Sequence, residues 1–295
     1  MTKVDELLIE GKVKEAIEIM CDLPEYEKER EQYIDLFENE HYRQYEVDGI
    51  LNEILLAYQQ YFRDVFYCNS DEEIAADKLI RKLYQTFSIS EKEKDALEDR
   101  LQELFEQKGY HALFGKTQGY FGPYIWKDTV PMSYQIELPE GVEQYTVNIL
   151  KGFVFRSWMD YLTFGKYGTG GWASEDGTIQ CIESAYDFES EKFTVSLLKH
   201  EAQHAKDLKE YPDITPAELE YRAKLVELYY SSDWELLGKF LKTADADKVN
   251  DSHAMASMRI KEEFSDGTYE DLEKIKERAL ELFKINTREL RHGSK

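Results

Sequence analysis

Basic residues, cysteines and long apolar runs are all scarce in this sequence of 295 residues. It has 37 lysines and arginines against 60 aspartates and glutamates, so its formal net charge is −23. The basic residues are scattered among acids, and a chain this acidic is repelled by nucleic acid and by anionic membrane surfaces. We therefore expect neither as a partner.

The three cysteines, Cys21, Cys68 and Cys181, lie far apart and are odd in number. They indicate no disulfide framework, and no two of them have the spacing of metal ligands. No segment reaches the roughly 18 uncharged apolar residues that a membrane-spanning helix requires. The opening residues, MTKVDELLIEGK, contain two acids before any apolar run, which is unlike a secretory signal. These absences together predict a cytoplasmic protein.

The residues that are abundant suit a folded, mostly helical protein. Hydrophobic residues make up 42% of the chain and aromatic residues 14%, which is enough for a substantial core. Apolar residues recur at helical spacing before residue 109 and after residue 190. Thr2 can cap a first short helix that Gly11 ends, and Ser90 with Glu93 forms a capping box at the start of a later one. Longer helices are expected near residues 26–38, 44–68, 71–87 and 90–108.

The region between these helical parts has a different composition. From residue 109 it is rich in glycine, proline and aromatic residues, which predicts loops. Two segments, SYQIELP and EQYTVNILKG, are typical of strands. Residues 170–184 are typical of a hairpin that turns at Glu175, Asp176 and Gly177. We expect an α+β fold that is predominantly helical, with the sheet confined to about residues 130–184. The predicted domains are a helical N-terminal domain (1–112), a small sheet packed on one helix (113–210) and a helical C-terminal subdomain (211–295).

One short motif in that packed helix carries chemistry. The segment KHEAQHAKD, residues 199–207, places His200 and His204 four positions apart, with Glu201 directly after the first histidine. On a helix these two imidazoles lie on one face a single turn apart, so both can bind one zinc ion, and Glu201 could take a proton from water that the ion activates. The motif shares an apolar stripe with Phe193, Leu197 and Leu208. The histidines are therefore expected to point inward.

A catalytic zinc needs a third protein ligand, and the next helix offers three glutamates. That helix begins at Thr215, which can form a capping box with Glu218 and so occupy that carboxylate. Glu220 is then free to bind the metal, and the small Ala223 leaves room for the two helices to approach closely. We therefore predict Glu220 as the third ligand, with Glu218 and Glu227 as alternatives.

HEAQH followed by Glu220-Tyr-Arg-Ala223 resembles the gluzincin branch of the zincin metallopeptidases, which have HExxH on one helix and ExxA on the next. The resemblance covers about residues 140–230. It implies a bound Zn²⁺, Glu201 as general base, and a peptide or protein substrate aligned over the metal by the edge strand of a small sheet. It also implies a donor for the oxyanion from the downstream helices. His253 is the candidate for this catalytic role, in competition with Tyr221, Tyr229 and Tyr230.

Two positions depart from the family pattern. Many gluzincins have an aspartate one residue after ExxA that orients a histidine, whereas this sequence has Lys224. Lys206 stands at a position of the histidine motif that is usually apolar. Support for the histidines must then come from another acid, and the candidates are Asp207 and Asp213.

The predicted function is that of a zinc-dependent hydrolase, most simply a peptidase in which Glu201 acts as base and then as acid. One alternative is a metal-binding module for protein interaction, in which the N-terminal helices recognise a partner and the zinc site is structural or vestigial. A structural site has no need of Glu201, which favours the enzyme. Another alternative is an acidic helical scaffold whose two histidines are ordinary core residues. The aromatic residues expected in the core rather than in a substrate pocket are Trp158, Tyr161 and Trp172.

Overall fold

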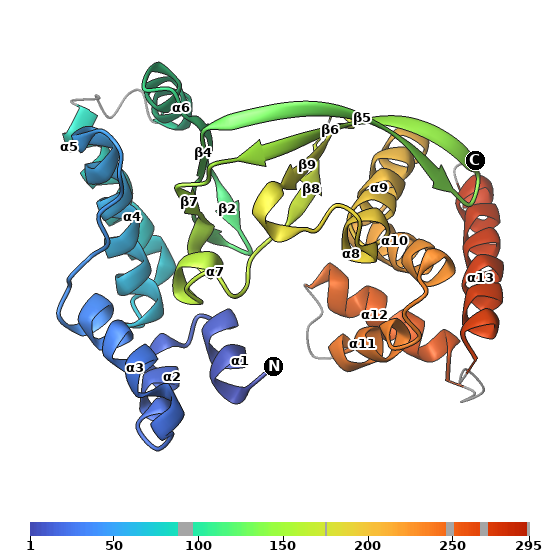
Figure 1. The fold of residues 1–295 in the computed structure, drawn as a ribbon, viewed down its shortest axis with the longest axis horizontal. Helices are drawn as coiled ribbons and strands as arrows, with labels where there is room; N and C mark the ends of the chain where they lie inside the picture. The colour runs from blue at the N-terminus through green and yellow to red at the C-terminus, as the bar shows by residue number, and fades with distance from the viewer. Residues whose placement is uncertain (88–96, 175, 246–250, 266–270, 294–295) are drawn as a thin grey trace. The chain divides into compact units, whose positions relative to one another are not determined.

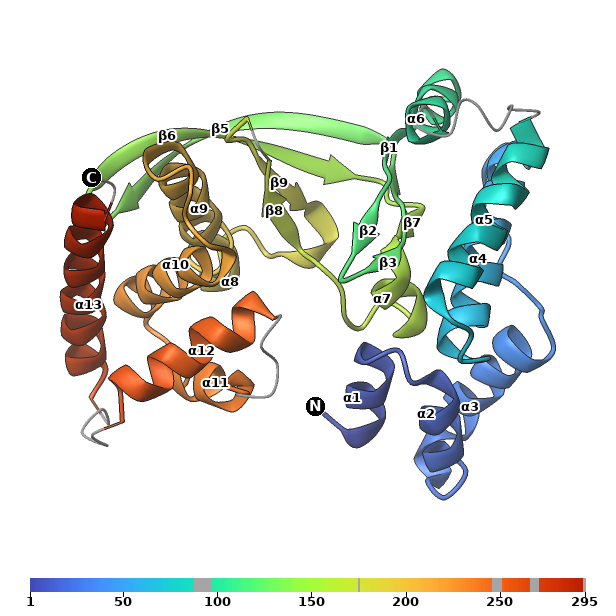
Figure 2. The same cartoon turned by 180° about the vertical axis from the view of Figure 1, so that it is seen from behind.

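A computed structural model of the chain describes residues 1–87, 97–174, 176–245, 251–265 and 271–293 (Figures 1 and 2). Helices predominate and the strands form small sheets, so the predicted α+β class is confirmed. No helix in these ranges is long and apolar enough to cross a membrane. Packing defines two compact units: unit 1 is Met1–Asp128 with Gly152–Gly168, and unit 2 is Thr129–Lys151 with Thr169–Lys295. The three domains expected from the sequence stay a prediction.

The helices of unit 1 begin and end where the sequence provides local signals. Thr2 caps the first helix through its side chain, as predicted. Gly11 follows that helix with a φ of +76°, and a Cβ there would lie 2.5 Å from the ring of Phe66. The box predicted at Ser90 and Glu93 lies outside the described residues. The helical elements are α1 (Lys3–Ile9), α2 (Val13–Met20), η1 (Pro24–Tyr26), α3 (Glu27–Tyr33), η2 (Ile34–Glu38), α4 (Gly49–Phe66), α5 (Glu72–Phe87), α6 (Leu97–Gln107) and α7 (Ser157–Leu162).

Short strands follow the helices of unit 1, although the sequence predicted loops there. One antiparallel sheet consists of β1 (His111–Leu113), β4 (Tyr124–Trp126) and β7 (Phe155–Arg156). A second, two-stranded sheet consists of β2 (Lys116–Thr117) and β3 (Tyr120–Phe121). The prediction that the sheet is confined to about residues 130–184 is therefore wrong. Strands of two or three residues are too short to show an alternation of apolar and polar residues, so the glycines and prolines dominate the pattern.

Aromatic side chains form much of the core of unit 1. Trp158 and Tyr161 on α7 are each 2% exposed, which confirms their predicted place in a core. The Trp158 ring stacks on Phe66 with 5.0 Å between the ring centres. The Tyr161 hydroxyl donates a hydrogen bond to the buried Gln59 side chain, so its polar end is satisfied.

Unit 2 contains a four-stranded mixed sheet in the order β5-β6-β9-β8. Strand β6 runs parallel to β9, with Val147 opposite Ile179, whereas β8 and β9 form the antiparallel hairpin predicted from the sequence. Gly177 takes a φ of +81° in the turn of that hairpin, and Glu175 lies outside the described residues. Strand β8 is thus an edge strand. The strands are β5 (Asp128–Leu138), β6 (Gly141–Lys151), β8 (Gly171–Ala173) and β9 (Ile179–Ile182).

The sequence predicted a single helix through the histidine motif, but the structure has two helices there. Ser190 caps the first, as predicted, but a three-residue turn separates it from the second. The β-branched residues Thr194 and Val195 disfavour helix at this point. The second helix ends before Tyr211, and Thr215 caps the next one, as predicted. The helical elements of unit 2 are η4 (Glu183–Ala185), α8 (Glu191–Thr194), α9 (Leu198–Glu210), α10 (Pro216–Tyr230), α11 (Leu236–Thr243), α12 (Ser252–Glu263) and α13 (Leu272–Gly293).

A buried ionic network joins three helices of unit 2, in which α10 packs against both α9 and α13 (Figure 1). Arg222 on α10 is fully buried, and its Nε and Nη2 donate to the two carboxylate oxygens of Asp207 on α9 at 2.7 and 3.0 Å. Its Nη1 donates to Asn286 and Thr287 on α13 at 2.9 and 3.0 Å. Because buried charges are stable only when they are paired in this way, the network holds the three helices in one arrangement.

Candidate metal centre

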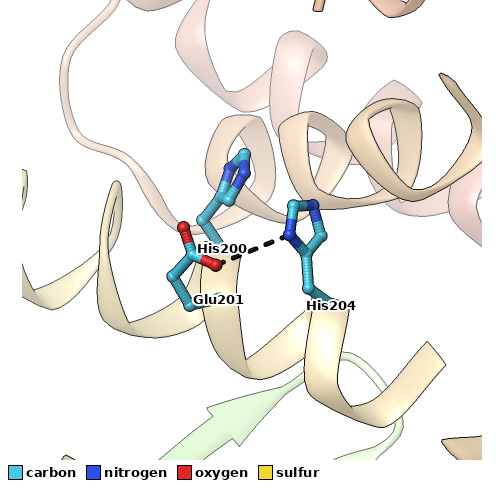
Figure 3. A group of neighbouring side chains, drawn as sticks. All are labelled: His200, Glu201 and His204. Carbon is cyan, nitrogen blue, oxygen red and sulfur yellow. Dashed lines mark ion pairs between the residues drawn. The ribbon is translucent and has the colours of Figure 1, made fainter. Parts of the chain in front are cut away.

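The two histidines of the HEAQH motif and Glu201 project from α9 beside one another (Figure 3). One donor atom from each of His200, Glu201 and His204 lies within 4.8 Å of the others. The three side chains are mostly buried, with 10%, 14% and 13% of their surfaces exposed. A group that could hold a metal ion is therefore present where the sequence predicted it.

These side chains face a cavity of about 570 Å³ within unit 2. Its walls are residues 169–173, which include β8, together with parts of α9 and α10, Tyr186 and the first turn of α12. Trp172 lines this cavity and is half-buried, so its predicted place in the core is wrong. Leu208 also lines it and is 43% exposed, so the apolar stripe predicted for the histidine helix is not buried along its whole length.

Glu220, the predicted third ligand, lies opposite both histidines. Its Oε2 is 3.4 Å from His200 Nε2, and its Oε1 is 3.8 Å from His204 Nε2. Burial would raise the pKa of Glu220, but its bonds to His200 and His253 hold that pKa well below its usual range. The carboxylate is therefore charged at neutral pH, as a metal ligand must be.

Glu218, one alternative to Glu220, has a different partner. Its two carboxylate oxygens accept hydrogen bonds from Arg259 Nη1 at 2.9 and 2.8 Å, and it also contacts Asn286. Thr215 accepts a hydrogen bond from the Glu218 backbone, but the Glu218 carboxylate turns to Arg259 instead of back to Thr215. The predicted capping box is thus only half formed, and ion pairing is what occupies Glu218.

Glu227, the other alternative, contacts His200 on the side away from Glu220. Its Oε1 lies 2.7 Å from His200 Nδ1, and Glu227 is 5% exposed. Burial would lower the pKa of His200, but hydrogen bonds to Glu220 and Glu227 raise it to about 10. A carboxylate on the far nitrogen of a histidine is the usual support of a metal ligand, because it fixes the ring and its tautomer.

The acids suggested from the sequence for this supporting role do not take it. Asp207 is fully buried and bonds Arg222, and Asp213 is exposed outside the cavity. Glu227 follows Glu220 by seven residues, which is two turns on the same face of α10. That spacing is the one feature of the sequence that could have indicated Glu227 as a residue of this site. The contact between Glu227 and His200 itself depends on the packing of α9 on α10.

His204 and Glu201 complete the centre. His204 Nδ1 lies 3.5 Å from Glu201 Oε2, whereas its Nε2 is buried and has no hydrogen-bond partner among the described residues. Glu201 Oε2 also accepts a hydrogen bond of 2.9 Å from the backbone N–H of Ala173 in β8. Burial would raise the pKa of Glu201, but His204 and His200 lower it. An ionised carboxylate is thus held between the histidine helix and the edge strand.

His253 reaches the cavity from the first turn of α12. Its Nδ1 lies 2.8 Å from Glu220 Oε2, and 62% of its side chain is exposed. The competing tyrosines do not line the cavity; Tyr221 for example is 1% exposed and packs under Arg259. The other two are Tyr229 and Tyr230. Tyr186, directly after η4, does line it, and no pattern in the sequence marked that residue.

Lys206, one of the two positions where the resemblance to gluzincins fails, has polar partners in unit 2. Its ammonium contacts Glu143 on β6 and lies 2.7 Å from Glu210 at the end of α9. The four-stranded sheet therefore supplies an acidic partner for this lysine. Tyr145 on β6 adds a hydrogen bond of 3.0 Å to the Ala202 carbonyl, which secures the same face of α9.

No family model matches this chain, and neither curated proteins nor solved structures give a significant match. The resemblance to gluzincins thus rests on the residues themselves. The geometry defines a protein in which His200, Glu201 and His204 form a group that could hold a metal ion.

Proposed function

We propose that this chain is a zinc-dependent hydrolase that acts on peptides, with His200, His204 and Glu220 as the metal ligands. One observation carries the proposal. The Nε2 atoms of both histidines face Glu220, at 3.4 and 3.8 Å, while the Nδ1 atoms face Glu227 and Glu201. The two Nε2 atoms are thus directed toward a common carboxylate, and Glu201 lies beside them on the other side of His204.

This donor set suits zinc. Two imidazole nitrogens and one carboxylate are common ligands of catalytic zinc, which keeps a further position open. The buried Nε2 of His204 has no hydrogen-bond partner in the described part of the chain, and its lone pair would coordinate the ion. When bound, zinc would polarise a carbonyl and lower the pKa of water. His200 would give up a proton on binding, and Glu227 would keep its ring in place.

Glu201 is placed to move a proton. Its Oε2 is held by the Ala173 N–H at 2.9 Å, so the carboxylate has a fixed position beside the histidines. Because the pKa of Glu201 is lowered, it is ionised at neutral pH and can accept a proton from water. The same carboxyl can then give the proton to the departing amine.

The edge of the sheet supports a peptide as the substrate. The Ala173 N–H points toward Glu201 rather than toward β9, so the open edge of β8 and Glu201 border the same space. Extended peptides commonly bind such edges through backbone hydrogen bonds. His253, which is largely exposed next to Glu220, is the residue that we propose as donor to the developing oxyanion.

The substitution Glu201→Gln tests the proposal, because it removes the base and keeps the size of the side chain. We expect this variant to retain its zinc and its unfolding temperature but to cleave a broad peptide library about 10² to 10⁴ times more slowly. Glu210→Gln, at the exposed end of the same helix, is the matched control and should cleave normally. His204→Ala should lose both zinc and activity.

Two results would count against the proposal. Cleavage by Glu201→Gln at the wild-type rate would show that the mechanism is wrong. A zinc-loaded wild type that cleaves no member of the library would favour a metal-binding module for protein interaction instead.

A further inference from the structure

A buried lysine lines the cavity beside the proposed ligands. Lys224 lies on α10, one helical turn after Glu220, and only 7% of its surface is exposed. Among the described residues that line the cavity, it is the one lysine or arginine. Lysines are almost never buried without a partner, so this position needs a physical explanation.

Lys224 has no ionic partner within the described residues. No carboxylate oxygen there lies within 4.0 Å of its Nζ, which instead lies 4.3 Å from the centre of the Phe240 ring. Lys206, by contrast, pairs with Glu143 and Glu210. Burial lowers the pKa of Lys224, because an ammonium loses part of its hydration there. An anion bound next to it would offset that cost.

The two carboxylates of α10 in the cavity face histidines and not Lys224. Glu227 bonds His200 Nδ1 at 2.7 Å, and Glu220 lies between the two histidines and His253. Because neither Glu220 nor Glu227 has an oxygen within 4.0 Å of Nζ, these two acids do not use the three N–H donors of the Lys224 ammonium.

Lys224 changes the net charge of the cavity. Three carboxylates face the cavity, from Glu201, Glu220 and Glu227, and a divalent ion would leave one negative charge uncompensated. Lys224 brings this total to zero. In a chain with a net charge of −23, an incoming anion is repelled by the overall charge, so a local cation determines whether it can bind.

We propose that Lys224 determines specificity by binding a carboxylate of the peptide substrate, from either its free C-terminus or an acidic side chain. The proposal rests on the function proposed above, because it places the substrate in the same cavity. The preferred substrates would then be peptides that have a carboxylate close to the bond that is cleaved.

The test measures binding and not turnover. Calorimetry compares the affinities of three N-acetylated peptides: acetyl-Ala-Leu-Ala as free acid, the same peptide as carboxamide, and acetyl-Ala-Asp-Ala carboxamide. The protein carries Glu201→Gln to prevent cleavage and is used both zinc-loaded and metal-free. Each titration is repeated with Lys224→Met, with Lys224→Arg to keep the charge, and with Lys239→Met. Lys239 is an exposed lysine paired with Asp233, so its loss changes the net charge equally.

We expect at least one acid peptide to bind roughly tenfold more tightly than the neutral one, about the contribution of one charge-assisted hydrogen bond. The free-acid and Asp peptides show which carboxylate is selected. Lys224→Met should abolish the preference, while Lys224→Arg and Lys239→Met should keep it.

An equal preference in Lys224→Met, or none in the parent protein, would overturn the proposal and leave Lys224 as a counter-charge to the neighbouring acids. Zinc content, measured on the same samples, separates the two proposals. A protein that holds no zinc but prefers the acid peptides would refute the proposed function and not the role of Lys224.

Discussion

Three glutamates on α10 allow the proposed ligand assignment to be tested by ranking. Glu220 faces both histidines, Glu227 bonds the far side of His200, and Glu218 bonds Arg259 outside the cavity. Each can be changed to glutamine, which keeps the shape of the side chain and removes its charge. We expect zinc affinity to fall most for Glu220→Gln, less for Glu227→Gln and not at all for Glu218→Gln.

The magnitudes follow from the contacts. Glu227 would act on zinc only through His200, and loss of such a supporting carboxylate typically costs about 10- to 100-fold in metal affinity. Glu220→Gln should cost more than that, because it removes an anionic ligand. Glu218 is 22% exposed and its partner Arg259 34%, so Glu218→Gln should lower the free energy of unfolding by no more than about 1 kcal/mol.

The assay is a competition titration of zinc against a chelator of known affinity, at one neutral pH, with the unfolding temperature recorded for each variant. A loss of affinity in Glu218→Gln that exceeds the loss in Glu220→Gln would assign the third ligand to Glu218. Equal losses in Glu220→Gln and Glu227→Gln would refute the distinction between ligand and supporting residue.

Three further predictions concern the surroundings of the site. Asp207→Ala should lower the free energy of unfolding in urea by about 3 to 5 kcal/mol, because it leaves Arg222 buried and uncompensated. Gly171→Ala should cost about 1 to 3 kcal/mol in the same assay, since its Cβ would lie 2.3 Å from the Gln180 carbonyl oxygen. The folded state raises the pKa of His200, so metal-free protein should lose stability as the pH rises from about 6.5 toward 10, relative to His200→Gln. If the free energy of unfolding of the metal-free protein, relative to that of His200→Gln, rises over that pH range, this reasoning is wrong.

The histidine pair could be predicted because it depends only on helical spacing. His200 and His204 are four residues apart, and any helix through them places both on one face. The place of Glu220 opposite the histidines agrees with the short connection between the two helices, but Glu218 is occupied by Arg259 and not by the predicted capping box. These features depend on local sequence, which determines where helices begin and end.

The rest of the site depends on packing between segments that are distant in sequence. The bond from Glu227 to His200, the approach of His253 to Glu220 and the hydrogen bond from Ala173 to Glu201 each join two different elements. No spacing within a single element determines them. The short strands of unit 1 were missed for a similar reason, since they are defined by their partners in the sheet.

Arg222 also links α13 to the helix that carries the two histidines. Asp207 follows His204 by three residues on α9, and through Arg222 it is joined to Asn286 on α13. An ion that bridges α9 and α10 would stabilise the arrangement in which these bonds form. Coupling of this kind is reciprocal, so an opening of α13 that breaks these bonds would weaken ion binding by the same free energy. Amide protons of α13 should therefore exchange with deuterium more slowly in the zinc-loaded protein, far along the chain from every proposed ligand.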